Sequence, residues 1–138
     1  MIKFIPITIL VISLTAACKN STVQNGSESP AQIEFKETIY DFGTIPYGSD
    51  GTCKFEFINS SEVPLVINMV KTSCGCTSPK WPKDPCESGK GGIIKITYNT
   101  SIKGTFRKSI TVYSNAKNSP LYLIIKGEVL AEKTNEKK

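Results

Sequence analysis

The sequence predicts an all-β protein, an immunoglobulin-like antiparallel β-sandwich of about seven strands. Short runs of residues alternate between apolar and polar side chains, and these runs are rich in β-branched and aromatic residues. Clusters of Gly, Pro, Asn, Asp and Ser separate the runs. No segment keeps the 3.6-residue period of an amphipathic helix. A small β-barrel is the alternative architecture, because periodicity does not show whether a sheet closes on itself.

Each predicted strand is justified by its own pattern, in chain order. The first run alternates and continues after a short break, the second has apolar odd positions with Lys54 and Glu56 between them, and the third is a short, mainly apolar run. The last three alternate again, with Ile, Val, Leu or aromatic residues at every second position except Lys108. The runs are residues 33–35 with 38–42, then 52–58, 65–70, 94–98, 106–112 and 121–126. The longest interval between runs, residues 72–92, is predicted to be a loop.

Length and composition limit the function. The chain has 138 residues, of which 39% are hydrophobic and 21% charged, which fits one folded domain. His is absent, which excludes histidine-based catalytic triads and zinc sites with histidine ligands. The formal charge of +5 comes from scattered Lys and Arg, without the clustering of a nucleic-acid footprint. We therefore expect no nucleic-acid partner, no cofactor and no enzymatic activity.

The first 17 residues have the features of an export signal. Lys3 precedes an uncharged apolar stretch, and the small residues at positions 15–17 come directly before Cys18. The apolar stretch is shorter than the roughly 20 residues that cross a bilayer as a helix. This arrangement is similar to a bacterial lipobox, in which the cysteine becomes the lipidated N-terminus. An ordinary secretory signal, with Cys18 an incidental thiol, is the alternative.

The chain therefore divides into four parts. Residues 1–17 form a lipoprotein signal peptide, and residues 18–32 form a lipidated cysteine with a flexible polar tether. The folded domain covers residues 33–130, and a charged tail covers residues 131–138. We expect the protein in the cell envelope, anchored to a membrane, the outer one, through its N-terminal lipid.

Several motifs resemble those of one known family. Residues 41–45 read Asp-Phe-Gly-Thr-Ile, and residues 73–77 read Ser-Cys-Gly-Cys-Thr, followed by Trp81 and Pro82. Further along the chain, the segments ITVYSN and KGEV continue the resemblance. Over residues 35–129 the sequence resembles the DUF1573 family, bacterial immunoglobulin-like domains of unknown function that are common on exported lipoproteins. The resemblance implies a fold related to chaperone-type modules and implies no reaction.

The cysteines allow three interpretations. If Cys18 carries the lipid, four thiols remain, and an exported domain usually oxidises an even number of them. A Cys74–Cys76 bond would close a very small ring, whereas a Cys53–Cys86 bond would staple the long loop to the sandwich. Alternatively, Cys-x-Cys thiolates suit a soft metal such as Cu(I) or Zn, with Met69 as a nearby thioether. The third interpretation is thiol–disulfide exchange, since a short Cys-Gly-Cys bond exchanges readily. The candidates are Cys53, Cys74, Cys76 and Cys86.

Trp81 is the candidate partner-binding residue. Its ring either packs over the end of the sandwich or protrudes as an aromatic anchor, as aromatic side chains do at interface cores. Stiffened by prolines, residues 72–92 would form a preorganised surface, and strand addition along a sheet edge is a second binding mode. The leading hypothesis is a lipid-anchored module that binds or scaffolds an unknown envelope protein or glycan. The alternative function is copper binding or thiol–disulfide exchange through Cys74 and Cys76.

Overall fold

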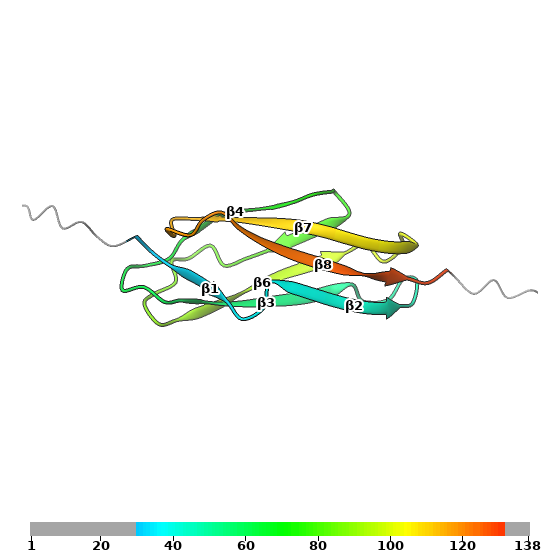
Figure 1. Ribbon diagram of the computed structural model, residues 1–138, viewed down its shortest axis with the longest axis horizontal. Coiled ribbons are helices and arrows are strands. Elements are labelled where there is room, and N and C mark those ends of the chain that lie inside the picture. The colour runs from blue at the N-terminus through cyan, green and yellow to red at the C-terminus, as the bar shows by residue number, and fades with distance from the viewer. Residues whose placement is uncertain (1–29, 132–138) are drawn as a thin grey trace, which may run out of the picture.

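The computed structural model describes residues 30–131 and shows two four-stranded sheets packed face to face (Figure 1). Sheet I has the strand order β1-β3-β6-β5, and sheet II has the order β2-β8-β7-β4. The strands are β1 (Ile33–Phe35), β2 (Ile39–Ile45), β3 (Thr52–Asn59), β4 (Ile67–Thr72), β5 (Thr77–Lys80), β6 (Gly91–Tyr98), β7 (Gly104–Ser114) and β8 (Leu121–Val129). This confirms the predicted all-β, immunoglobulin-like sandwich. The predicted signal peptide, Cys18 and most of the tether and tail lie outside the described residues.

The core is built by the period-two pattern of the strands. In β3, the side chains of Cys53, Phe55 and Phe57 are buried, while Lys54 and Glu56 between them are exposed. The other central strands alternate similarly, so each sheet presents an apolar face to its partner. Burying one such side chain contributes roughly 1.5–3 kcal/mol, and these contacts hold the two sheets together.

A stacked aromatic pair joins the two sheets near one end of the sandwich. Tyr98 on β6 and Phe106 on β7 lie with ring centroids 3.9 Å apart and an interplanar angle of 14°. The same end needs a glycine at position 51, because a Cβ there would lie 2.3 Å from the carbonyl oxygen of Tyr98. We call this the Tyr98 end; β8 finishes there, whereas β1 begins at the opposite end (Figure 1).

A buried amide ties the opposite end together. The side chain of Asn59 has no exposed surface, and its Nδ2 donates to the carbonyl oxygens of Val63 and Cys86 at 2.8 and 2.9 Å. Its Oδ1 accepts bonds from the backbone N–H and the hydroxyl of Ser61. The amide thereby joins the connection after β3 to the connection before β6. We call this the Asn59 end.

Two details of the predicted fold are wrong. The stretch over residues 72–92 is not one loop, because it contains the edge strand β5, which pairs with β6. The described residues form eight strands, which agrees with the predicted number of about seven. The sheets are also not wholly antiparallel, since β2 runs parallel to β8. Alternation reports which face of a strand is buried, and it carries no information on the direction of the partner strand.

Candidate functional site

The Cys-Gly-Cys segment forms the turn between β4 and β5, where the chain crosses from sheet II to sheet I. Cys74 and Cys76 are joined by a disulfide, with their Cα atoms 5.3 Å apart. Both are half-buried, and Gly75 between them is exposed. This bond, one of those considered from the sequence, is therefore formed, and it lies at the surface of the sandwich.

Backbone hydrogen bonds hold this turn on both sides. The hydroxyl of Thr72 donates to the carbonyl oxygens of Cys74 and Thr77 at 2.9 and 3.1 Å. The Ser73 N–H donates to the Ser109 carbonyl on β7, and the Asn99 N–H donates to the Cys76 carbonyl. These bonds attach the turn to both sheets, so its shape does not depend on the sulfur–sulfur bond alone.

Thr77 follows the turn and points into the protein. Its side chain is 3% exposed, and its Oγ1 lies 3.7 Å from Cys74 Sγ and 3.8 Å from Cys76 Sγ. Buried hydroxyls in folded proteins are almost always hydrogen-bonded. Among the described residues, the two sulfurs are the only partners of this hydroxyl.

The other two described cysteines are free and lie far apart. Cys53 is buried near the start of β3, whereas the Cys86 carbonyl accepts the bond from Asn59 at the end of that strand. Six residues of strand separate Cys53 from Asn59, or about 20 Å at roughly 3.3 Å per residue. The Cys53–Cys86 bond considered from the sequence is therefore not formed, because a disulfide needs Cα atoms within about 7 Å.

The positions of the cysteines also bear on the soft-metal interpretation. In the disulfide, Cys74 and Cys76 do not present the thiolates that Cu(I) or Zn would need. Within residues 30–131, no three Cys, Asp or Glu side chains converge on one point that could hold a metal ion. Burial also raises the pKa of the Cys53 thiol to about 12, so this sulfur stays protonated near neutral pH.

Trp81 follows β5 and covers part of the core next to β4. The residue is half-buried against the core, and its Nε1–H donates to the Ile67 carbonyl on β4 at 3.3 Å. The ammonium of Lys83 lies 3.2 Å from the centroid of the indole ring. The structure thus places the ring in a packing position. The predicted role of Trp81 as a partner anchor stays a prediction.

A row of lysines crosses the outer face of sheet I. Lys54 on β3 stands directly opposite Lys95 on β6, and Lys95 stands directly opposite Lys80 on β5. All three side chains are exposed, and none makes a salt bridge with another described residue. We call them the lysine row. Its residues are scattered in the sequence, and only the strand register brings them together.

A row of hydroxyl groups lies beside the lysine row, two residues away from the lysine in each of the three strands. Thr52 is paired with Thr97, and Thr97 with Ser78, in the same three strands. The Oγ1 atoms of Thr52 and Thr97 are 3.3 Å apart. Ammonium groups and hydroxyls together make this face rich in hydrogen-bond donors.

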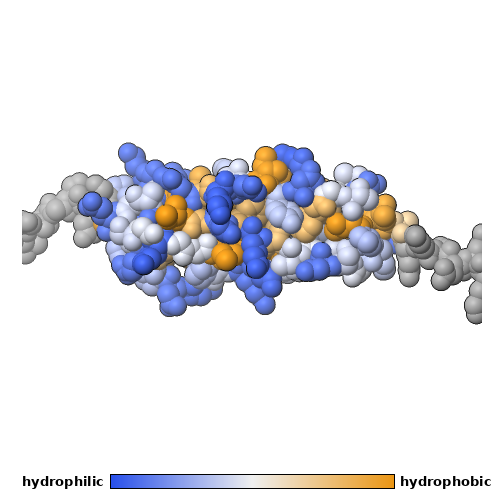
Figure 2. Space-filling view, turned by 90° about the horizontal axis from the view of Figure 1, so that it is seen from below, coloured by the Kyte–Doolittle hydropathy of each residue, from blue (hydrophilic) through white to orange (hydrophobic). Residues whose placement is uncertain are grey.

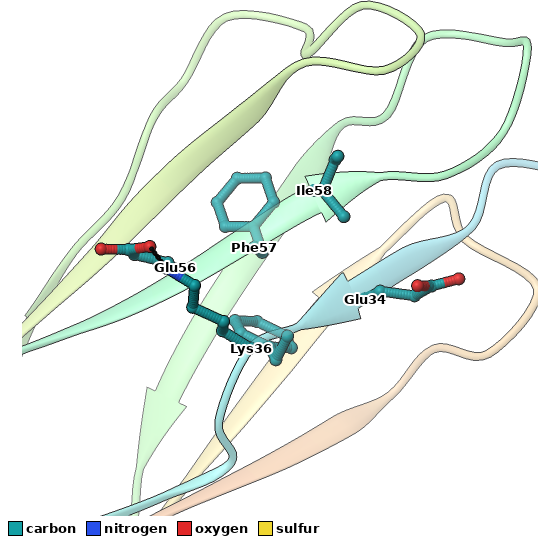
Figure 3. Close-up of a pocket in the computed structure, with 6 residues that line it drawn as sticks. Glu34, Lys36, Glu56, Phe57 and Ile58 are labelled. Carbon is teal, nitrogen blue, oxygen red and sulfur yellow. Dashed lines mark hydrogen bonds and ion pairs between the residues drawn. The ribbon is translucent and has the colours of Figure 1, made fainter.

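A surface hollow of about 300 Å³ lies on the β1 side of the same sheet (Figure 3). Lys36 and Glu56 point toward each other across it, with 2.7 Å between Nζ and Oε2, and Glu34 points away. The hydrogen bond from Lys36 lowers the pKa of Glu56. The hollow thus holds a neutralised ion pair. Viewed from below, the molecule has separate hydrophobic areas among projecting hydrophilic side chains (Figure 2).

Comparison with known families gives one match. Residues 33–129 match the model of DUF1573, a protein family of unknown function. The chain belongs to the DUF1573 family. The match covers nearly all of the described sandwich and confirms the family that the sequence motifs resemble. No curated protein matches the sequence significantly.

Solved structures similar to this DUF1573 domain show the same fold at low sequence identity. A Porphyromonas gingivalis protein of unknown function has a TM-score of 0.67 and 15% identity, over 78% of this chain and 51% of its own. The PapD-like domain 7 of human CEP192 has a TM-score of 0.63 and 13% identity, over 88% and 99%. The Pseudomonas aeruginosa chaperone CupB2 has a TM-score of 0.52 and 11% identity, over 73% and 57%.

These likenesses establish the sandwich and leave the function of the DUF1573 domain open. The chain spans about half the length of the Porphyromonas protein. Within residues 30–131, the structure has no helix long and apolar enough to cross a membrane. The features of this chain that bear on function are the Cys74–Cys76 turn and the lysine row. The motif allowed the Cys74–Cys76 bond as one of three interpretations. The sequence did not indicate the lysine row, because Lys80 lies in a stretch that was predicted to be a loop.

Proposed function

We propose that this DUF1573 protein is a lipid-anchored, non-catalytic component of the cell envelope. Its sandwich binds an anionic envelope protein or glycan through the outer face of sheet I. The export signal and Cys18 in the sequence support the anchor. The resemblance to PapD-like and chaperone structures supports a binding role, since those modules share this fold.

The observation that carries the proposal is the lysine row. Like charges directly opposite each other in neighbouring strands destabilise a sheet. Adjacent strands are separated by roughly 5 Å, so the three lysine side chains leave neighbouring strands side by side, with no acidic side chain directly opposite. A partner carrying carboxylates, phosphates or sulfates would relieve this repulsion on binding. The adjacent hydroxyl row would donate further hydrogen bonds to the same oxygens.

The extent of the two rows favours an extended partner over a small molecule. The lysine and hydroxyl rows span three neighbouring strands, and Lys54, at the β3 end of the lysine row, also lines a surface hollow together with Lys36 and Glu56. A polymer that repeats its negative charge could contact both rows at once. Each exposed charge pair contributes only about 0.2–1 kcal/mol, so binding needs several of them together.

The test is capture of the partner in intact cells. A photo-crosslinking amino acid at Thr97, beside the lysine row, is expected to capture an envelope protein or glycan, identified by mass spectrometry and by protease or glycosidase digestion. The variant with Lys54→Glu, Lys80→Glu and Lys95→Glu is expected to lose capture by about tenfold or more, from three lost charge pairs.

The matched control changes the same number of charges elsewhere. Lys71→Glu, Arg107→Glu and Lys117→Glu are exposed positions away from the lysine row and give the same net charge. This control variant is expected to capture the partner as the wild type does. Capture is also expected to fall as salt rises, because the Debye length shortens to about 3 Å at 1 M. Equal capture by both triple variants would contradict the proposal.

A further inference from the structure

We propose that the Cys74–Cys76 bond is an exchangeable disulfide that accepts two electrons from the dithiol of a partner protein. In this reaction the hydroxyl of Thr77 donates a hydrogen bond to the cysteine that leaves as a thiolate. The site is separate from the lysine row, and its chemistry requires neither the lipid anchor nor the anionic partner.

The bond lies in an exposed turn. Cys74 and Cys76 are half-buried, and a Cβ added at Gly75 between them would meet no atom within 4 Å apart from those of these two neighbours. The turn lies outside the hydrogen-bond ladders of β4 and β5, which end at Thr72 and begin at Thr77. An incoming thiolate therefore need not displace a strand to reach a sulfur atom.

The protein keeps the two cysteines together after reduction. The bonds from Thr72 Oγ1, from the Ser73 N–H and from the Asn99 N–H fix the backbone of the turn without the disulfide. A ring that spans two residues also restricts the unfolded chain very little, so the fold depends little on this bond. The reduced turn thus holds its thiols at bonding distance, and the bond can be reformed by an oxidant.

Thr77 is placed to assist the exchange. Its inward position in β5 would suit Val, yet a hydroxyl is buried there, and its partners are the two sulfurs at 3.7 and 3.8 Å. A hydrogen bond to a thiolate favours the charged form and makes that cysteine a better leaving group. Because the hydroxyl lies nearly equidistant from both sulfurs, it can serve whichever one leaves.

The exchange balances in two steps. A thiolate of the partner attacks one sulfur, the Cys74–Cys76 bond breaks, and its electron pair leaves on the other cysteine as a thiolate. The second thiolate of the partner then attacks the partner's own sulfur in the mixed disulfide and releases the second cysteine. The partner becomes a disulfide, and Cys74 and Cys76 become two thiols that carry the protons lost by the partner.

The other described thiols do not interfere. Cys53 is buried, and the raised pKa of its thiol keeps it protonated and unreactive near neutral pH. Cys86 lies at the Asn59 end, whereas the Cys76 carbonyl is bonded to Asn99 next to the Tyr98 end. Reduction of the Cys74–Cys76 bond therefore leads to no rearranged bond with either of them.

The experiment follows reduction of the purified full-length protein, in detergent, by dithiothreitol and by glutathione buffers. Peptide mapping after alkylation reports Cys74 and Cys76 separately from the other cysteines, and Trp81 fluorescence reports folding. The bond is expected to be reduced while the protein stays folded. Thr77→Val is expected to slow reduction by about fivefold or more, since a hydrogen bond to a charged group is lost.

A second readout separates this role from a structural one. In the reduced protein, the pH profile of alkylation is expected to shift upward in Thr77→Val, because the thiolate loses its donor, and Thr77→Ser is expected to restore both rate and profile. A bond that resists reduction until the protein unfolds would overturn the proposal. Wild-type rates and profiles in a folded Thr77→Val variant would overturn the role of Thr77.

Discussion

At the scale of single residues, Trp81 shows how a surface aromatic closes a sandwich. Its ring packs against the core, its N–H bonds to Ile67, and Lys83 covers its outer side. Trp81→Ala removes all three contacts. We expect the free energy of unfolding to fall by about 2 kcal/mol, less than the 3–5 kcal/mol of a fully buried Trp, since the residue is only partly buried. Urea denaturation followed by circular dichroism measures the loss.

Trp81→Phe separates packing from partner binding. Phe keeps most of the apolar contact and loses the hydrogen bond to Ile67, so we expect only about 1 kcal/mol of lost stability. The photo-crosslinking assay then tests the folded variant. Loss of capture by a stable Trp81→Phe variant would assign the ring to the partner-binding surface. An unchanged unfolding free energy in Trp81→Ala would instead refute the packing role.

Residue pattern alone could predict some of these positions and not others. The alternation of β3 predicted that Cys53 points inward, and the structure places it in the core. The partners of Asn59 and Thr77 could not be predicted in this way. Asn59 bonds to Cys86, 27 positions away, and the sulfurs beside Thr77 depend on the turn geometry. Hydrogen bonds of this kind follow from tertiary packing, which a single sequence does not contain.

At the scale of strands, the lysine row is expected to lower the stability of sheet I while providing the charges that bind the partner. Lys95 lies between Lys54 and Lys80, so Lys95→Glu replaces two repulsive cross-strand pairs by two attractive ones. Each opposite-charge pair contributes roughly 0.2–1 kcal/mol. We expect the variant to be more stable than the wild type by about 0.5–1 kcal/mol at low salt, and to bind the anionic partner less well. Urea denaturation at two salt concentrations measures the first effect.

Lys95→Gln is the matched control for this substitution. It removes the repulsion without adding an attraction, so its gain in stability is expected to be smaller. The gain of Lys95→Glu should shrink at high salt, because exposed charges are screened. Glu56 lies diagonally from position 95, but its charge is already neutralised by Lys36. Lower stability of Lys95→Glu at low salt would show that the row is not repulsive.

The strands also show where sequence patterns stop being informative. The strands with clear alternation were found from the sequence: β3 was predicted nearly to its ends, and β6 was predicted apart from its first three residues. In contrast β5 reads Thr-Ser-Pro-Lys, four residues without an apolar alternation, and it becomes a strand because β6 offers it a free edge. Pro at such a position is tolerated on an edge strand, since no neighbour needs its missing N–H. The lysine row could not be predicted for the same reason, because one of its three lysines, Lys80, lies on β5.

At the scale of the whole molecule, the N-terminal connection and the Cys74–Cys76 turn lie toward opposite ends of the sandwich. β1 begins at the Asn59 end, so a tether that precedes Pro30 joins the sandwich there (Figure 1). The Cys74–Cys76 turn instead bonds to Asn99, next to the Tyr98 end. A membrane anchor at the N-terminus would therefore hold the sandwich by one end. The disulfide and the nearby hydroxyl row would then face away from the attachment point.

This arrangement gives the anchor a testable consequence. Cys18→Ser removes the thiol that the lipid needs, and we expect the protein to move from the membrane fraction to the soluble fraction of the envelope, without a change in melting temperature. Labelling with an alkyne fatty acid should be lost in the same variant. Cys86→Ser is the matched control, because it also removes one free thiol, and it should keep both the fatty-acid label and the location in the membrane fraction.

Partner capture at Thr97 should fall in Cys18→Ser when the partner is itself membrane-bound, since the anchor raises its effective concentration. Fatty-acid labelling of Cys18→Ser at the wild-type level would contradict the anchor, while leaving the lysine row and the disulfide chemistry to their own tests.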